Sequence, residues 1–360
     1  MSLLSKLSIV IPTYNRQSYA LRNMGYWSKY DVKVHVLDGS IEAIPSKYIS
    51  RMGSNIHYHH LPISIGERLV YAGNLKTSEY IILSGDDEFF IPSALSTCID
   101  ELENDKSLVS CMGRCMWFNH HEGALRTDLI YKNMANYSVQ HDSPDDRVLY
   151  HMKHYRPSTI YSVMRADIWK RTVSCINNEQ YSVVALEELQ FEVASSYLGK
   201  SKVLPILLWM RSGENTGLTD KSNLKKIGDW WTDSLNDELR EQMLSELTCK
   251  ILTNQDNVDV DSVKKVIAKS FEMFIDRPKR QLPIKSIVIF QVARLLSMLP
   301  RVIKDILKRP AHTTYYNLND FYDIDLTIKQ LEMEEVSVNL DELKDIESTV
   351  VDFHNNLSDK

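Results

Sequence analysis

An apolar run that ends in three adjacent acids constrains the fold of this chain more than any other feature. Residues 80–83 (Tyr-Ile-Ile-Leu) are typical of a buried strand, and residues 84–88 read Ser-Gly-Asp-Asp-Glu. Adjacent carboxylates repel one another and resist burial unless a cation or a hydrogen-bonding ligand compensates them. A divalent ion that bridges to substrate phosphates would supply that compensation, and open α/β sheets bind ligands at the carboxyl ends of their strands. The alternative is a solvated acidic turn before a helix that begins near Pro92.

The N-terminal part of the chain alternates strand-like and helix-like segments, which predicts an α/β fold with a mostly parallel sheet. The expected strands are 7–11, 32–37, 56–61, 79–83, 108–118, 158–165 and 203–210. The expected helices are 18–30, 66–75, 92–104 and 185–197. Residues 119–155 are polar with few periodic apolar positions, so we expect a long surface excursion there. Its histidines are expected to be exposed loop residues: His120, His121, His141, His151 and His154.

Beyond about residue 220 the pattern changes to helices, which predicts a domain over 1–220 and a helical C-terminal module over 221–360. The expected helices are 223–252, 261–275 and 283–307. Residues 277–309 carry nine Lys and Arg residues against one acid, and the helix at about 283–307 has an apolar face opposite a basic one. Such a helix suits an anionic membrane surface; the alternative is packing of its apolar face on the domain at 1–220. The acidic tail, 310–360, would fold back on this helix or dock on a partner.

Composition narrows the class of protein. The net charge of −6 argues against a general nucleic-acid binder, and the five scattered cysteines are expected to be reduced thiols. No apolar run reaches the roughly 18 residues that a membrane-spanning helix needs, and the first residues lack the pattern of a signal peptide. We therefore expect a cytoplasmic protein, with a peripheral position on the inner face of the plasma membrane if the basic helix binds lipid.

Four segments, in this order, resemble the motifs of GT-A glycosyltransferases, specifically the large family 2 of nucleotide-sugar-dependent enzymes. They are 9–16 (Ile-Val-Ile-Pro-Thr-Tyr-Asn-Arg), 36–40 (Val-Leu-Asp-Gly-Ser), 85–88 (Gly-Asp-Asp-Glu) and 186–189 (Leu-Glu-Glu-Leu). A helix with Gly-Glu-Arg at 66–68 and with Asn74 also fits that pattern. Each motif alone is weak, and their order and spacing carry the resemblance, which covers about residues 7–215. It implies a GT-A, Rossmann-like fold for that part of the chain.

The chain departs from the family pattern in two motifs and in its C-terminal region. Gly85 stands where many members carry a further acid, so contacts to a metal ion could be shifted by one residue. The base position holds Glu188 rather than the commoner Asp, which keeps the carboxylate chemistry and lengthens its reach by one methylene. The helices after residue 220 are not explained by the resemblance.

The acidic motif is expected to hold a metal ion. Transfer from a nucleotide sugar expels a diphosphate, and a divalent ion neutralises the charge that builds on its oxygens. The resemblance implies Mg²⁺ or Mn²⁺, with Asp87 as a ligand and Asp86 close to the metal or to the ribose. Glu88 would add charge or cap the following helix.

A second set of residues is expected to bind the nucleotide sugar: Pro12, Tyr14, Arg16, Asp38, Arg68, Asp86 and Arg211. By the resemblance, Asp38 would accept a hydrogen bond from the base, against which Pro12 and Tyr14 would lie. An ordinary turn in Asp-Gly-Ser is the alternative for Asp38.

The basic residues of this set would contact phosphate or base. Arg16 and Arg68 could equally be surface arginines. Arg211, with Asn215, would hold the diphosphate unless the pair belongs to a loop salt bridge.

Displacement at the anomeric carbon needs one general base on the acceptor hydroxyl. Glu188 is the candidate, with Glu187 as the alternative catalytic residue. Paired acids at a helix start can also simply favour the helix dipole. A single carboxylate base without a second nucleophile implies an inverting reaction, as the resemblance does.

The sequence therefore predicts a metal-dependent, inverting glycosyltransferase. It would move a sugar from a nucleotide-diphosphate donor to a glycan or lipid-linked acceptor in cell-surface polysaccharide or lipopolysaccharide assembly, with uridine favoured only at family level. One alternative is a sugar-phosphate nucleotidyltransferase, although residues 12–16 lack its Gly-rich phosphate loop. The other is a non-catalytic nucleotide-sugar-binding scaffold. Oligomerisation and membrane contact through 283–307 are left open.

Overall fold

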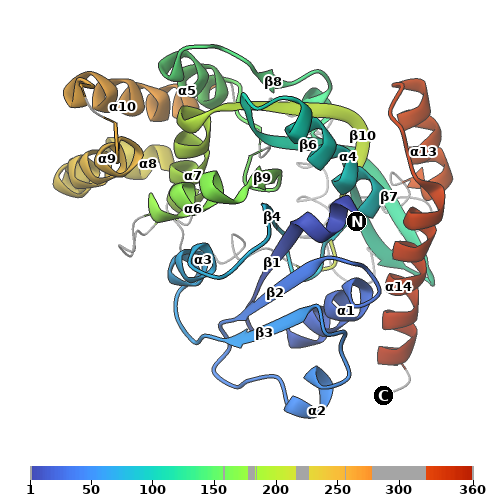
Figure 1. Ribbon diagram of the computed structural model, residues 1–360. Helices are drawn as coiled ribbons and strands as arrows, with labels where there is room; N and C mark the ends of the chain where they lie inside the picture. Colours follow the sequence, from blue (N-terminus) through green and yellow to red (C-terminus); the bar gives the residue numbers. More distant parts are fainter. Residues whose placement is uncertain are drawn as a thin grey trace, which may run out of the picture.

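A computed structural model describes residues 2–156, 159–176, 183, 185–215, 227–255, 257–277 and 322–358. Its strands form one mixed, twisted sheet in the order β11-β7-β6-β9-β4-β1-β2-β3, with β10 pairing with β5, β6 and β8 (Figure 1). The first strands are β1 (Leu7–Thr13), β2 (Lys33–Asp38), β3 (Ile56–His60), β4 (Tyr80–Leu83) and β5 (Phe89–Phe90). The later strands are β6 (Leu108–His121), β7 (Ala124–Ile130), β8 (Ser138–Val139), β9 (Val163–Arg165), β10 (Lys200–Ser212) and β11 (Tyr322–Asp323).

The N-terminal half of the sheet is parallel, and this brings the ends of three strands together. In the register of β1, Thr13 lies opposite Asp38 of β2, and Val10 lies opposite Leu83 of β4. Beyond β4 the sheet becomes mixed, because β9 runs antiparallel to β4 while β10 runs parallel to β6. The structure thus confirms the predicted α/β, Rossmann-like class and places the acid-bearing loop beside the ends of β1 and β2.

Helices cover both faces of the sheet (Figure 1). The first are α1 (Gln17–Trp27), α2 (Ser46–Ile49), α3 (Ile65–Gly73), α4 (Pro92–Asn104), α5 (Pro144–Lys153), α6 (Ala166–Ser174) and α7 (Ala185–Leu198). The later ones are α8 (Ile227–Thr232), α9 (Asp237–Ile251), α10 (Val260–Asp276), α13 (Ile324–Met333) and α14 (Leu340–Ser358). Apolar residues of α1, α4, α13 and α14 share one core with the sheet, and those of α3, α6 and α7 share a core on its other face.

The prediction of a long surface excursion at 119–155 is wrong. The segment contains β7, β8 and α5, and β7 buries alternate residues including Leu125, Thr127 and Leu129. A threonine at the middle buried position hides this alternation in the sequence. In α5 the buried positions include Arg147 and His151, so the apolar stripe of that helix is also incomplete. The strand expected at 158–165 is found only as β9 at its end, and α6, which follows it directly, was not predicted.

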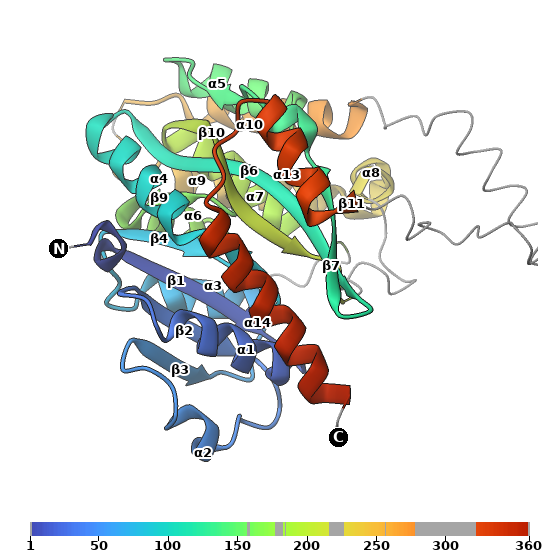
Figure 2. The same cartoon turned by 90° about the vertical axis from the view of Figure 1, so that its right-hand side faces the viewer.

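Helices follow residue 220, as the sequence predicts, while the domain boundary itself stays a prediction. Residues of α9 and α10 share an apolar core with α5 and α7. In the part of the acidic tail that the structure describes, α13 and α14 pack on the sheet, and α14 runs beside α1 (Figure 2). Docking of the tail on the basic helix or on a partner stays a prediction. The basic helix at 283–307 lies outside the described residues. Among the helices that are described, none combines the length and the apolar character that crossing a membrane requires.

Candidate functional site

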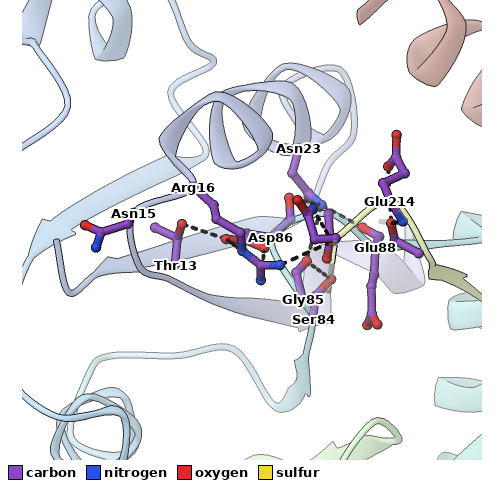
Figure 3. Close-up of polar contacts among 12 residues, drawn as sticks. Thr13, Asn15, Arg16, Asn23, Ser84, Gly85, Asp86, Glu88 and Glu214 are labelled. Carbon is purple, nitrogen blue, oxygen red and sulfur yellow. Dashed lines mark hydrogen bonds and ion pairs between the residues drawn. The ribbon is translucent and has the colours of Figure 1, made fainter. Parts of the chain in front are cut away.

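Asp86 lies in the loop after β4 and is buried against the end of β1. The Thr13 hydroxyl donates to Asp86 Oδ2 at 2.7 Å, and the Arg16 guanidinium pairs with Oδ1 at 2.6 Å. Figure 3 shows Thr13 and Arg16 directed at this carboxylate. Burial, reinforced by the charge of Asp87, raises the pKa of Asp86 to about 6. The carboxylate therefore sits in a place where additional positive charge would be stabilising.

Asp87 is held at its side chain and at its backbone. Asn215 Nδ2 donates to Asp87 Oδ2 at 2.7 Å, and Arg16 lies 3.4 Å from the same oxygen. Arg22 of α1 donates to the Asp87 carbonyl at 3.1 Å. The neighbouring Asn23 donates to the Glu88 carbonyl at 2.6 Å. Helix α1 thus fixes the backbone of the acidic loop while leaving the two aspartate side chains to Arg16 and Asn215.

Glu88 neither caps the following helix nor joins the other two acids. Its side chain points inward, where the indole of Trp209 donates to Oε2 at 3.0 Å and Arg211 lies 3.9 Å from Oε1. Burial and the charge of Asp87 raise the pKa of Glu88 to about 8. A Cβ on Gly85 would lie 2.9 Å from Glu88 Cγ. The glycine that departs from the family pattern therefore leaves the space that this inward glutamate fills.

The adjacent carboxylates of Asp86 and Asp87 fit a hard divalent ion. The half-exposed Arg16 guanidinium already bridges both of them and so lies where positive charge is required. Among the described residues, no group of three or more His, Cys, Asp or Glu side chains is arranged to hold a metal ion. A pair of carboxylates still suits Mg²⁺ or Mn²⁺, because such an ion takes its remaining ligands from substrate phosphates and water.

Asp38 and Arg68 brace the strand ends beside the acidic loop. Asp38 is buried and accepts hydrogen bonds from the Ser40 backbone at 2.9 Å, from Tyr58 at 2.7 Å and from Gln17 at 3.0 Å. Burial acts to raise the pKa of Asp38, but these hydrogen bonds outweigh it and leave the pKa below its usual value. Arg68 is also buried and donates from Nη1 to the carbonyls of Thr13 and Leu37. Arg68 therefore joins β1 to β2 whether or not it also meets a ligand.

The remaining residues expected to bind the nucleotide lie around this edge of the sheet. Pro12 lies near the end of β1, and the ring of Tyr14 is 49% exposed just beyond it. Arg211 contacts the Tyr131 hydroxyl, and its guanidinium lies over the rings of Tyr131 and Trp209. The structure thus places the predicted residues near the carboxyl ends of β1, β2, β4 and β10, and their roles toward a nucleotide stay predictions.

The candidate base lies in the first turn of α7. Glu188 accepts a hydrogen bond from the Tyr155 hydroxyl, and Glu192 lies one turn further along the helix. Burial and the charge of Glu192 raise the pKa of Glu188, although Tyr155 and Arg277 oppose that rise. Burial alone raises the pKa of Glu187. A raised pKa makes a carboxylate a better proton acceptor, which is what a general base requires.

Tyr161 is influenced by the charges of the acidic loop after β4 and of the acids in α7. Its ring stacks on Trp209 at 4.5 Å between centroids. The charges of Glu88, Glu188, Glu192 and Asp87 all add to the effect of burial in raising its pKa. Phe191 of α7 shares an apolar core with Leu83 at the end of β4. The candidate base and the acidic loop are therefore parts of one region.

A buried histidine behind the candidate base was not predicted. The Nδ1 atom of His151 forms a hydrogen bond with the Tyr137 hydroxyl at 2.6 Å, and its Nε2 atom lies 2.8 Å from Glu192 Oε2. Both His151 and Glu192 are fully buried, so the expectation that His151 is an exposed loop residue is wrong. The sequence signal that could have pointed to Glu192 is its spacing of four residues from Glu188, which puts both acids on one face of a helix.

The fold and the site define a Rossmann-like α/β protein that carries paired acids at the carboxyl end of a parallel strand. No protein-family model matches the chain, and no curated protein matches it. Crystal structures of S. aureus TarS are similar in fold. TarS 1-349 aligns over 75% of this chain and 88% of its own, with 13% identity and a TM-score of 0.43. The same fragment in complex with UDP-GlcNAc aligns over 74% and 71%, with 15% identity and a TM-score of 0.48. Its complex with UDP aligns over 74% and 70%, with 14% identity and a TM-score of 0.46.

Proposed function

We propose that this protein is a metal-dependent glycosyltransferase that uses a nucleoside-diphosphate sugar. The observation that carries the proposal is the buried Asp86–Asp87 pair, which Arg16 bridges at the end of β4. A bound Mg²⁺ or Mn²⁺ would neutralise the departing diphosphate. Asp86 and Asp87 would hold that ion, while Thr13 and Asn215 fix the orientation of their carboxylates.

In this proposal Glu188 takes the proton from the acceptor hydroxyl. Its burial favours the protonated product of that step, and Tyr155 orients the carboxylate by donating to it. The acceptor oxygen then attacks the anomeric carbon directly, which inverts its configuration. The acidic loop, which would bind the donor, and α7, which would activate the acceptor, both contribute charge to the raised pKa of Tyr161.

The proposed acceptor is a glycan or a lipid-linked glycan of the cell surface, as the sequence resemblance implies. Membrane contact through 283–307 and a place on the inner membrane face stay predictions. Vesicle flotation of the full chain and of a variant lacking 277–309 tests them, and equal recovery of both with the soluble fraction would contradict membrane contact.

A thermal-shift panel tests the proposed donor class. The wild-type protein is heated with UDP, GDP or CDP, each with Mn²⁺ and each with a chelator instead. We expect one diphosphate, UDP by the resemblance, to raise the melting temperature only when Mn²⁺ is present. Equal shifts with the chelator would contradict metal dependence, and no shift with any of the three would contradict the donor class.

A further inference from the structure

The corner that follows β10 links the acidic loop to the C-terminal helix. Asn215 donates to the Asp87 carboxylate at 2.7 Å. The preceding residue, Glu214, pairs with Arg22 at 2.7 Å and with His354 of α14. Figure 3 shows Glu214 beside the acidic loop. A chain of polar contacts therefore runs from Asp87 through Glu214 to His354 of α14, which lies 140 positions beyond Glu214 in the sequence.

Arg22 is the centre of this link. It is buried, it donates to the Asp87 carbonyl at 3.1 Å, and it binds both oxygens of Glu214. Its guanidinium lies 4.9 Å from the centroid of the Tyr19 ring and 4.7 Å from that of Phe353. Phe353 comes from α14, so this helix closes one side of the space in which Arg22 is held.

The end of α14 is itself fixed in place. The ring of His354 stacks on His120 of β6 with 4.2 Å between centroids and an angle of 5°. At its other end α14 is attached separately, because Glu342 accepts hydrogen bonds from the backbone and hydroxyl of Ser93 at the start of α4. Helix α14 contacts α1 along its course, and the two run side by side in Figure 2.

We propose that Phe353 and His354 are positioning residues for the metal and diphosphate site. They hold Arg22 and Glu214, and Glu214 keeps Asn215 on the Asp87 carboxylate that would ligate the ion. The nature of the ligand rests on the proposed function, whereas the link between Asp87 and α14 does not. Because energetic coupling is reciprocal, a ligand at Asp87 must also stabilise the end of α14.

Binding of UDP with Mn²⁺ tests the proposal, using His354→Ala and a matched control in the same helix. Glu342→Gln weakens the distant attachment of α14 without touching Glu214. We expect His354→Ala to bind UDP about 10-fold more weakly, as loss of a residue that orients a metal ligand does. We expect Glu342→Gln to bind as wild type, and His354→Gln to regain most of the affinity by donating to Glu214. Wild-type affinity in His354→Ala, or an equal loss in Glu342→Gln, would overturn the proposal.

Amide hydrogen exchange provides an arm that needs no ligand and so separates this proposal from the proposed function. Asn215→Ala breaks the link at Asp87, and we expect faster exchange of residues 350–356 in that variant than in wild type. Unchanged exchange there would overturn the proposal even if UDP binds. Adding UDP and Mn²⁺ should slow exchange of the same residues in wild type only; no effect of the ligand, with the variant difference present, would count against the proposed function alone.

Discussion

The acids after β4 are buried and the acids at the start of α7 are half-buried, and their charge is compensated in different ways. Asp86 and Asp87 share the Arg16 guanidinium and also accept hydrogen bonds from Thr13 and Asn215. Glu188 receives one tyrosine hydroxyl and lies one turn from another acid. Burial raises the pKa of both Asp86 and Glu188. In the first arrangement the Arg16 guanidinium opposes that rise and lies where a bound cation would keep the carboxylates ionised. In the second arrangement the raised proton affinity suits a group that accepts a proton.

Asp87→Asn is expected to have the largest effect, because it removes charge from the group built to face a cation. A metal ligand contributes several kcal/mol, so affinity for UDP with Mn²⁺ should fall about 100-fold or more and transfer should fall with it. Titration calorimetry measures the affinity. Asparagine keeps the shape and can still meet Asn215, so the melting temperature without ligand should change little. Unaltered UDP affinity would contradict the contrast drawn here, in which the acids after β4 hold a cation and the acids of α7 accept a proton.

Glu188→Gln is expected to affect transfer without affecting binding. Loss of a general base costs about 10²- to 10⁴-fold in rate, while UDP affinity with Mn²⁺ should match wild type. Glu187→Gln is the matched control on the neighbouring residue, and a small effect is expected. Release of the nucleoside diphosphate from a donor sugar reports the rate. If the control loses activity and Glu188→Gln keeps it, Glu187 is the base; if neither changes the rate, α7 has no catalytic role.

Two variants around Glu188 should move the pH dependence of transfer in opposite directions. The rate requires ionised Glu188, so it falls on the acid side at a pH above the usual range of a glutamate. Tyr155 lowers the pKa of Glu188, and Tyr155→Phe should therefore move this limb to higher pH. The charge of Glu192 raises that pKa, so Glu192→Gln should move the limb to lower pH. A pH–rate profile measures both shifts, and movement in the same direction would contradict the role of Glu188.

The same raised pKa has a consequence for stability, and this is the smallest effect expected. A carboxyl whose pKa is higher in the folded state stabilises the fold below its unfolded pKa, and that contribution is lost as the pH rises through the folded pKa. Glu188→Gln should therefore melt at a higher temperature than wild type at pH 7, with a smaller difference at pH 4. A lower melting temperature of the variant at pH 7 would show that the charged form is well compensated.

The acid-bearing end of β4 could be predicted from the sequence because its signal is local. Four apolar residues precede the acids, and parallel pairing alone then brings Thr13 and Asp38 to the same edge. Helix α4 begins at Pro92 and ends at Asn104, where the sequence placed it, since proline marks the first turn of a helix.

The surroundings of the acids after β4 and of those in α7 could not be predicted, because they consist of contacts between segments far apart in the sequence. Arg22, Glu214 and His354 meet only after β10 and α14 are in place. His151 looked like a loop residue because its neighbour in α5, Arg147, is also polar and buried. Arg147 donates to the Ser196 and Tyr197 carbonyls at the end of α7, so its burial satisfies that helix terminus. Hydrophobic periodicity does not detect a helix that packs through such polar contacts.

Electron paramagnetic resonance of Mn²⁺ tests the central claim most directly. The signal of free Mn²⁺ is followed while UDP is added to the wild-type protein and to Asp87→Asn. If the carboxylates after β4 hold a cation that grips a diphosphate, wild type should remove free Mn²⁺ when UDP is present, beyond what UDP removes alone, and Asp87→Asn should not. Equal loss of the free signal with both proteins would contradict the account.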